Sequence, residues 1–385
     1  MKVFLLAGEA SGDKLGAALM AGLLKHMPNR PEFYGVGGPL MEQAGLKTLF
    51  PMSDISLMGI SEILSKYRFL KRRIAEAADA VIAGEADVLI TIDLPEFSLR
   101  LAKAVRRRKQ VPSVHYVAPT VWAWRPGRAQ KMAPFVDHVL ALFPFEPPYM
   151  QAAGMSCDFV GHPVVNDPCA TRGEAQRFRA ETGIDDAPMI LCLPGSRGSE
   201  IKRLAPVFAK VVEKLHAARP DLKFVLPMAA SVVTLVKDQI ETWPVKPFLI
   251  EPRSDVHAYS QKRAAFQAAD VALAASGTVA LELAATQTPM VVAYDMGFLS
   301  RQIIGRMLKV ETVSLVNLIT DSKSIPEFIA ENCREELITP SVLKVLDDPT
   351  GQIQAMQSTM QALGQNGHPP GERAAQSVIK FLAAQ

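Results

Sequence analysis

The sequence is poor in the residues and motifs that mark several specialised protein classes. Only four of its 385 residues are cysteine, with no C-x-x-C pair and no histidines beside them at zinc-ligand spacing. Neither a disulfide framework nor a metal site is indicated, and a reducing compartment such as the cytoplasm is expected. The D-x-D motif is absent as well. We therefore expect neither a metal ion nor another cofactor.

Long apolar segments are also missing. No stretch approaches the roughly 20 apolar residues that a membrane-spanning helix needs. The N-terminal apolar run of residues 3–7 is too short for a signal peptide and leads directly into Gly8 and Glu9. We expect a soluble protein for which any membrane contact is peripheral.

Positive charge is only slightly in excess. The formal net charge is +3, and residues 1–165 hold 19 Lys and Arg against 15 Asp and Glu. This excess is too small to indicate a nucleic-acid partner, but the basic clusters at residues 71–73 and 106–109 are compatible with anionic lipid. A solvated helix face is the alternative, and for the second cluster it is the preferred interpretation.

The length predicts two domains, because a chain of 385 residues exceeds the size at which one hydrophobic core stops growing. Hydrophobic residues make up 49% and charged residues 21%, as in ordinary globular proteins. The alternation of strands and helices pauses after residues 158–165. We predict a first domain over residues 1–165, a second over 166–350 and a helical segment over 351–385.

Short apolar runs alternate with helical patterns in both halves, which predicts parallel sheets covered on both faces. The expected fold is therefore α/β, with two doubly wound Rossmann-like domains facing a cleft. Ligands bind such sheets at the carboxyl ends of the strands. The expected strands are residues 3–7, 32–38, 87–93, 113–117, 137–142 and 158–165, then 189–193, 223–227, 247–250, 271–274 and 290–294.

The loop after the first strand of the second half is a candidate anion site. It reads LPGSRGSEI over residues 193–201 and leads into a helix. Backbone N–H groups at a helix start, together with the Arg197 guanidinium, are suited to bind a diphosphate. Gly195, Ser196 and Arg197 are therefore candidate nucleotide-binding residues, although an ordinary turn with a solvated arginine remains the alternative. The loop is neither a Walker A motif nor a G-x-G-x-x-G fingerprint.

A second loop of the same kind reads AASGTVALE over residues 274–282. Ser276 and Thr278 can cap the helix that follows Gly277, and the N–H groups of that helix can receive phosphate oxygens. Glu282 lies one turn further on and can accept hydrogen bonds from ribose hydroxyls. A solvent-facing or capping carboxylate is the alternative for Glu282.

In the first half, the candidate general base is Asp93. It ends a buried strand beside a proline-stiffened turn, where a carboxylate can face a cleft. The alternative is that Asp93 caps a helix that begins at Ser98. Glu96 and Asp13 are the next candidates for the base.

The loop after the first strand of the first half carries Glu9, Ser11, Gly12 and Asp13. These residues are expected at the same edge of the sheet as Asp93. Two other features stay open. His115 at a strand end either orients a ligand or is structural, and Trp122 next to residues 123–125 either stacks on a sugar, lies at a lipid interface or packs between helices.

A stretch from residue 55 to 73 mixes apolar and basic side chains at helical spacing. Such a helix can lie on an anionic membrane surface and admit acyl chains. Packing into the core is the alternative and must hold for about half of these residues. The candidate membrane or acyl contacts are Leu57, Met58, Ile60, Phe69 and Leu70.

Taken together, the ordered motifs closely resemble those of bacterial lipid-A-disaccharide synthases. The likeness runs from the first strand to residues 326–327. The motifs are AGEASGD (7–13), GVGGP (35–39), MGI (58–60), IDLPEF (92–97), HYVAPTVWAWR (115–125), PFE (144–146), VGHP (160–163), LPGSRGSE (193–200) and ASGT (275–278).

This resemblance implies a GT-B fold and an inverting, metal-independent transfer of 2,3-diacylglucosamine from UDP onto 2,3-diacylglucosamine 1-phosphate (lipid X). The product would be a β-1′,6-linked lipid A disaccharide 1-phosphate. The implied enzyme is cytoplasmic, peripherally bound to the anionic inner membrane and homodimeric, with no nucleic-acid partner.

The resemblance also assigns roles to single residues. It implies that Asp93 is the base that deprotonates the acceptor 6-hydroxyl. It places Glu9, Ser11 and Asp13 in the transfer-site loop. It assigns the UDP side to Arg197, Ser276, Gly277, Thr278, Glu282 and Asn317. The family often has aspartate at position 96 and proline before Asn317, and this chain departs from both patterns.

Two other functions remain open from the sequence. A UDP-N-acetylglucosamine 2-epimerase would share the two-domain fold and the UDP side but need no acyl-binding surface. A non-catalytic protein that binds a nucleotide sugar or a lipid would share the pocket but release no UDP.

Overall fold

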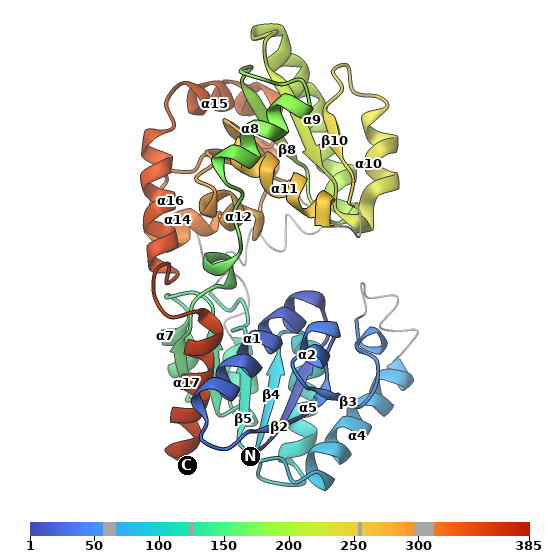
Figure 1. Ribbon diagram of the computed structural model, residues 1–385, viewed down its shortest axis with the longest axis vertical. Helices are drawn as coiled ribbons and strands as arrows, with labels where there is room; N and C mark the ends of the chain where they lie inside the picture. Colours follow the sequence, from blue (N-terminus) through green and yellow to red (C-terminus); the bar gives the residue numbers. More distant parts are fainter. Residues whose placement is uncertain (57–66, 123–126, 253–255, 296–311) are drawn as a thin grey trace. The chain divides into compact units, whose positions relative to one another are not determined.

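The computed structural model describes residues 1–56, 67–122, 127–252, 256–295 and 312–385 (Figure 1). The chain divides into two compact units, Met1–Asn166 with Leu363–Gln385 and Asp167–Ala362. Each unit contains one parallel sheet covered by helices, which confirms the predicted α/β class. Within the described ranges, no helix is long and apolar enough to cross a membrane.

The sheet of the first unit has the strand order β3-β2-β1-β4-β5-β6-β7. Ala7 pairs with Ile92, and Ile92 pairs with Tyr116, so the loops after β1, β4 and β5 leave the sheet side by side. The strands are β1 (Lys2–Ala7), β2 (Glu32–Val36), β3 (Lys47–Thr48), β4 (Val88–Ile92), β5 (Ser113–Tyr116), β6 (His138–Ala141) and β7 (Ser156–Phe159).

Helices flank this sheet because their apolar faces pack on fully buried strands such as β4. They are α1 (Ala10–His26), α2 (Pro39–Gln43), α4 (Tyr67–Ala83), α5 (Pro95–Arg106), α6 (Gly127–Met132), α7 (Pro147–Gln151) and α17 (Pro370–Ala383). Short 3-10 helices cover Met52–Asp54 and Pro163–Asn166.

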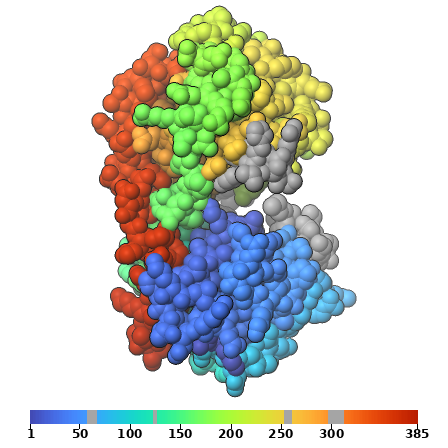
Figure 2. All heavy atoms as spheres, in the orientation of Figure 1, coloured from blue at the N-terminus to red at the C-terminus, as the bar shows by residue number. Residues whose placement is uncertain are grey.

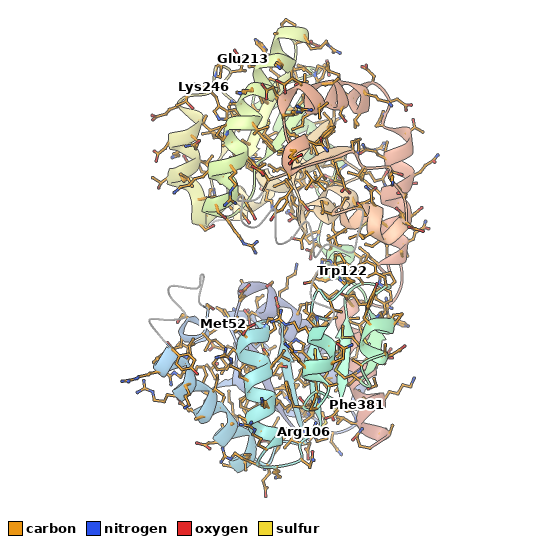
Figure 3. All side chains as sticks on the ribbon, turned by 180° about the vertical axis from the view of Figure 1, so that it is seen from behind. Met52, Arg106, Trp122, Glu213, Lys246 and Phe381 are labelled. Carbon is orange, nitrogen blue, oxygen red and sulfur yellow. The ribbon has the colours of Figure 1, made fainter. Side chains whose placement is uncertain are left out.

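The C-terminal helix α17 belongs to the first unit and lies beside α1 (Figure 2). The two backbones approach closely, because a Cβ atom at Gly22 would lie 2.7 Å from the carbonyl oxygen of Gly371. Further along α17, Phe381 stacks on the buried ring of His138 at 5.0 Å (Figure 3). Residues 351–385 are therefore divided between the two units, because α16 (Thr350–Ala362) belongs to the second unit and α17 to the first.

The sheet of the second unit has the strand order β10-β9-β8-β11-β12-β13. Its strands are β8 (Met189–Leu193), β9 (Lys223–Pro227), β10 (Phe248–Ile250), β11 (Val271–Ala275), β12 (Met290–Tyr294) and β13 (Glu327–Ile329). Its other helices are α8 (Arg172–Glu181), α9 (Gly198–Ala218), α10 (Val233–Ile240), α11 (Val256–Ala268), α12 (Val279–Ala285), α14 (Leu315–Thr320) and α15 (Glu335–Asp347). Short 3-10 helices cover Ala230–Val232 and Ala330–Asn332.

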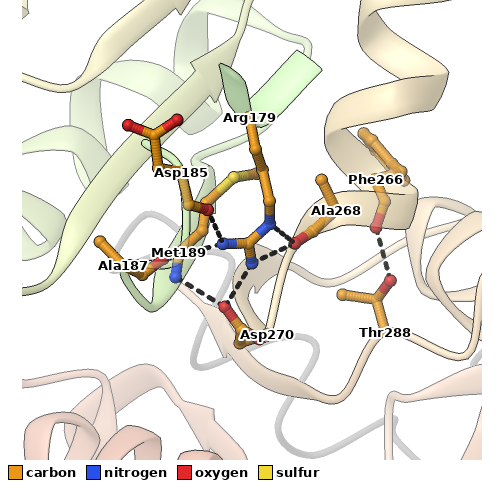
Figure 4. A network of polar contacts seen from close by, with 8 residues as sticks. All are labelled: Arg179, Asp185, Ala187, Met189, Phe266, Ala268, Asp270 and Thr288. Carbon is orange, nitrogen blue, oxygen red and sulfur yellow. Dashed lines mark hydrogen bonds and ion pairs between the residues drawn. The ribbon is translucent and has the colours of Figure 1, made fainter. Parts of the chain in front are cut away.

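One guanidinium holds several elements of the second unit together at the end of the sheet remote from the loops described below. Arg179 of α8 donates to the carbonyl oxygens of Ala187 and Ala268 and pairs with Asp270 at 2.7 Å (Figure 4). Asp270 in turn accepts the Met189 backbone N–H. These bonds satisfy backbone groups at the end of α11 and just before and at the start of β8.

The structure differs from the sequence expectation at several element ends. The two-residue strand β3 and the strand β13 were not predicted. Helix α5 begins at Pro95 rather than Ser98, because proline is favourable in the first turn of a helix. The strand expected at residues 158–165 ends at Phe159, and the 3-10 helix that follows it begins at Pro163.

Candidate active site

Two strand-to-helix loops of the second unit line one pocket of about 400 Å³. Leu193 of β8 pairs with Ala274 of β11, so the loops after these strands leave the sheet as neighbours. The pocket brings together seven residues that the sequence proposed for nucleotide binding: Gly195, Ser196, Arg197, Ser276, Gly277, Thr278 and Glu282. Pro227, Met228 and Ala229, at the end of β9, add an apolar wall.

A carboxylate already occupies the first of these loops. Glu200 accepts hydrogen bonds from the backbone N–H groups of Ser196 (2.9 Å) and Arg197 (3.2 Å). Gly195 has φ +117°, and a Cβ atom there would lie 2.5 Å from Glu200 Oε2, so only glycine accommodates this arrangement. Glu200 of α9 thus serves as the acceptor of these two N–H groups.

The Arg197 side chain remains available for a ligand. Its guanidinium lies 3.5 Å from Glu200, and the side chain is 79% exposed. An ion pair of this exposure contributes little stability, so the guanidinium can turn toward an anion in the pocket at small cost.

The second loop leaves helix α12 without a side-chain cap. Thr278 is the N-cap residue, but its hydroxyl caps no N–H group within the described ranges. The Ser276 hydroxyl instead donates to the carbonyl oxygen of Val313 at 3.3 Å. Neither residue therefore caps the helix as expected. The Ser276 hydroxyl is bound to Val313, and the Thr278 hydroxyl caps no N–H group among the described residues.

Glu282 lines the pocket and pairs with a residue that the sequence analysis did not single out. Its Oε2 atom lies 2.8 Å from Lys262 Nζ, and the side chains are 43% and 40% exposed. Lys262 lies on α11, one turn before Phe266, and its ammonium is 5.1 Å from the centre of that ring. In the sequence, the only signal for Lys262 is its i, i+4 spacing to Phe266 on the same helix.

Asn317 lies outside the lining of this pocket. It is 2% exposed, and its amide makes three bonds to described residues: it donates to the Ile325 carbonyl and to Glu327, and it accepts the Ile325 N–H. Glu327 also accepts the Val313 and Ser314 N–H groups. Through Glu327, Asn317 thus helps to hold Val313, whose carbonyl accepts the Ser276 hydroxyl, and it does not face the pocket itself.

In the first unit, Asp93 sits on a strained turn between β4 and α5. Asp93 and Leu94 have φ values of 50° and 45°, a left-handed conformation that costs non-glycine residues roughly 1 kcal/mol or more each. The Asp93 N–H donates to the Tyr116 carbonyl at 2.9 Å, and the Asp93 carbonyl accepts the Ser98 hydroxyl at 2.6 Å. Leu94, not Asp93, is the N-cap residue of α5.

Burial raises the pKa of the Asp93 carboxyl, and a hydrogen bond from the Leu94 backbone opposes that rise. The side chain is half-buried, so it remains accessible. His115 on the neighbouring strand is 1% exposed and its Nδ1 atom bonds the Thr91 hydroxyl at 2.8 Å. Because burial lowers the pKa of His115 to about 4, its ring is neutral at physiological pH and acts as part of the core.

Asp13 is not a second candidate base. Its carboxylate is 3% exposed and accepts the backbone N–H groups of Gly38 (2.9 Å), Leu40 (3.0 Å) and Met41 (2.9 Å). It therefore binds the start of α2 and has no accessible face. Gly12 is also buried, under Ala7.

Glu9 and Ser11 are exposed at the start of α1, at the same edge of the sheet as Asp93. Glu96 is 64% exposed and pairs with Arg128 at 2.9 Å and with Arg100 at 3.6 Å. Because Glu96 is exposed and paired with two arginines, we interpret it as a surface ion-pair partner rather than as the general base.

The candidate membrane contacts are only partly described. Leu57, Met58 and Ile60 lie outside the described residues. Leu70 packs against the core of the first unit, as the alternative interpretation expected. Phe69 is half-buried, with the Arg72 and Arg73 guanidinium groups 5.4 and 5.2 Å from its ring centre.

A buried acid that the sequence analysis quoted only within the PFE motif lies after β6. Glu146 is 3% exposed and accepts the Leu142 and Phe143 N–H groups, both at 3.0 Å. Burial raises the pKa of its carboxyl to about 7. Nearby, Phe145 stacks on Phe143 at 5.5 Å and meets the Trp122 ring edge to face at 5.1 Å (Figure 3).

Solved structures share this architecture. The UDP-GlcNAc 2-epimerase of Neisseria meningitidis, bound to UDP-GlcNAc, superposes with a TM-score of 0.63 at 13% identity, covering 100% of both chains. MurG of Acinetobacter baumannii gives a TM-score of 0.54 at 14% identity, covering 100% of this chain and 99% of that one. At these identities the likeness establishes the GT-B fold alone.

Sequence relatives are much more similar. A family model described as lipid-A-disaccharide synthetase matches residues 3–380. The lipid-A-disaccharide synthase of Ruegeria pomeroyi is 53% identical over 384 residues, covering 99% of this chain and 96% of that protein. The enzyme of the same name from Rhodospirillum centenum is 43% identical over 385 residues, covering 99% and 94%. The chain therefore belongs to the lipid-A-disaccharide synthase family.

Proposed function

We propose that this chain transfers 2,3-diacylglucosamine from UDP to the 6-hydroxyl of 2,3-diacylglucosamine 1-phosphate. Membership of a glycosyltransferase family supports the reaction class. The observation that carries the proposal is that the Arg197 loop and the Ser276 to Thr278 loop line one pocket. An exposed cation, a helix start and an apolar wall together suit a nucleoside diphosphate.

On the donor side, the Arg197 guanidinium neutralises the diphosphate as the glycosidic bond breaks. The N–H groups of Gly277 and Thr278, at the start of α12, donate to no acceptor within the described ranges and are available to phosphate oxygens. Glu282 accepts hydrogen bonds from the ribose. Together these groups stabilise charge that grows on UDP in the transition state.

On the acceptor side, Asp93 removes the proton from the attacking hydroxyl. Burial raises its pKa, which makes the carboxylate a stronger base. The anomeric centre inverts in one displacement, because Asp93 activates the acceptor and forms no bond to the donor sugar. Glu9 and Ser11 lie at the same sheet edge and contact the sugar at the transfer site.

We also propose that the enzyme works at an anionic membrane surface without spanning it. Arg68, Lys71 and Arg72 are exposed on α4, where they can meet lipid headgroups. Both substrates carry acyl chains, so a peripheral position would give the enzyme access to them.

The decisive experiment supplies the protein with UDP-2,3-diacylglucosamine and the acylated 1-phosphate acceptor and identifies the products. We expect UDP and a disaccharide 1-phosphate in equal amounts, and no UDP without acceptor. Conversion of UDP-N-acetylglucosamine to its 2-epimer, with no disaccharide, would refute transfer and favour the epimerase. Binding of the donor without any turnover would favour a non-catalytic role.

A further inference from the structure

Lys262 is a cation in the nucleotide pocket with two close neighbours. Its Nζ atom lies 2.8 Å from Glu282 Oε2 and 5.1 Å from the centre of the Phe266 ring. Phe266 is only 3% exposed, so the ring supports the ammonium from a rigid position. An ammonium over an aromatic face and against a carboxylate is held from two directions.

The helix that carries Lys262 is itself anchored at its end. Arg179 donates two hydrogen bonds to the Ala268 carbonyl, and Thr288 donates to the Phe266 carbonyl at 2.7 Å (Figure 4). These bonds satisfy carbonyl groups of the last turn of α11, which have no partner within the helix. They anchor the end of the helix that carries Lys262.

The pocket is electrically balanced by two ion pairs. Among its described lining residues, the charged side chains are Arg197, Glu200, Lys262 and Glu282. Glu200 is compensated by two backbone N–H groups and by Arg197. Glu282 has Lys262 as its partner within the described ranges, and its Oε1 atom accepts no hydrogen bond there.

We propose that Lys262 is a positioning residue that holds Glu282 for the nucleotide. The ammonium binds Oε2, fixes the carboxylate on the pocket wall and leaves Oε1 for the vicinal hydroxyls of a ribose. It also cancels a negative charge that would otherwise repel the diphosphate in the same pocket. The inference rests on the proposed function, in which this pocket takes UDP.

Calorimetric titration of UDP into Lys262→Met, Lys262→Arg, Glu282→Gln and the double variant tests this role. Lys262→Met should weaken UDP binding by about fivefold, and Lys262→Arg should restore it because a guanidinium can bind the same oxygen. In the Glu282→Gln background, Lys262→Met should change the affinity by less than about twofold, because the partner charge is gone. In Lys262→Met, the KM for the donor should rise, whereas kcat at saturating donor should stay unchanged.

Lys237→Met is the matched control. Lys237 pairs with Glu251 at 2.5 Å, the two side chains are 46% and 44% exposed, and Lys237 is not among the residues that line the pocket. This variant should bind UDP like the wild type. Undiminished binding by Lys262→Met, or an equal loss in the Glu282→Gln background, would overturn the positioning role while leaving UDP binding intact. Failure of the wild type to bind UDP would instead overturn the proposed function and this inference together.

Discussion

The Ser98 hydroxyl donates a 2.6 Å hydrogen bond to the carbonyl oxygen of Asp93, on the turn that connects β4 to α5. Asp93 is in a left-handed conformation that non-glycine residues avoid, and its N–H is bound by Tyr116. Such strain persists only where the surroundings hold it in place. Ser98 thus helps to aim the carboxylate through the backbone.

Replacing Ser98 with alanine should lower kcat by about tenfold, since a displaced base is a less effective one. Stability should fall by about 1 kcal/mol through the lost hydrogen bond. Steady-state kinetics and urea unfolding measure both effects. Ser113→Ala is the control, because the Ser113 hydroxyl is equally buried and has no partner among the described residues. Equal losses in the two variants would contradict a specific role for Ser98.

Replacing Asp93 with asparagine should abolish transfer and leave the fold intact. The folded-state pKa of Asp93 is raised above 3.8, so ionisation of this group favours the unfolded chain. Stability is therefore lost in the wild type as pH rises through the raised pKa, and Asp93→Asn escapes that loss. The stability of the variant relative to the wild type should increase as pH rises above about 4, as measured by urea unfolding.

Glu96→Gln is the matched control for Asp93, because Glu96 lies three residues further along the chain in an exposed ion pair. Its activity should stay within about twofold of the wild type. If Glu96→Gln were inactive and Asp93→Asn active, the roles of these two acids would be exchanged.

The sequence predicted the strands well because fully buried parallel strands read as continuous apolar runs, as in β4 and β8. It missed β3, which has two exposed residues, and it did not assign α17 to the first unit. That assignment depends on the close approach of Gly22 and Gly371. No local pattern encodes a contact between residues so far apart in the sequence.

The site was predicted in part. Loops after adjacent strands were expected to converge, and the Arg197 and Ser276 loops do. The hydrogen-bond partner of each polar side chain was not predictable. The Asp13 carboxylate accepts the Gly38 backbone N–H, and the Glu200 carboxylate accepts the Ser196 N–H of its own loop. Lys262 was missed because its partner lies on another helix.

Replacing Asp13 with alanine should destabilise the first unit by about 3 kcal/mol, because three N–H groups at the start of α2 lose their acceptor. Asparagine should recover only part of this loss, since one of its two side-chain atoms donates rather than accepts. Urea unfolding followed by circular dichroism measures the change. Ser11→Ala, at an exposed position of the same helix turn, should unfold like the wild type. If Asp13→Ala were as stable as Ser11→Ala, the carboxylate would be free for another role.

Replacing Glu146 with glutamine should make the first unit less sensitive to alkaline pH. Burial raises the pKa of Glu146 from 4.5 to about 7. A group whose folded pKa is raised stabilises the fold fully below the unfolded value, and that stability is lost as pH rises through the folded value. The stability of Glu146→Gln relative to the wild type should therefore increase from about pH 5 to about pH 8.

The glutamine carbonyl can accept the same Leu142 and Phe143 N–H groups, so the change isolates charge from hydrogen bonding. Glu146→Ala removes the oxygen that accepts both bonds and should be less stable than Glu146→Gln at every pH, because the Leu142 and Phe143 N–H groups are left unpaired. Urea unfolding at several pH values, followed by tryptophan fluorescence, compares the three proteins. Parallel pH profiles for the wild type and Glu146→Gln would mean that Glu146 ionises without cost, and so that its carboxyl is reached by water.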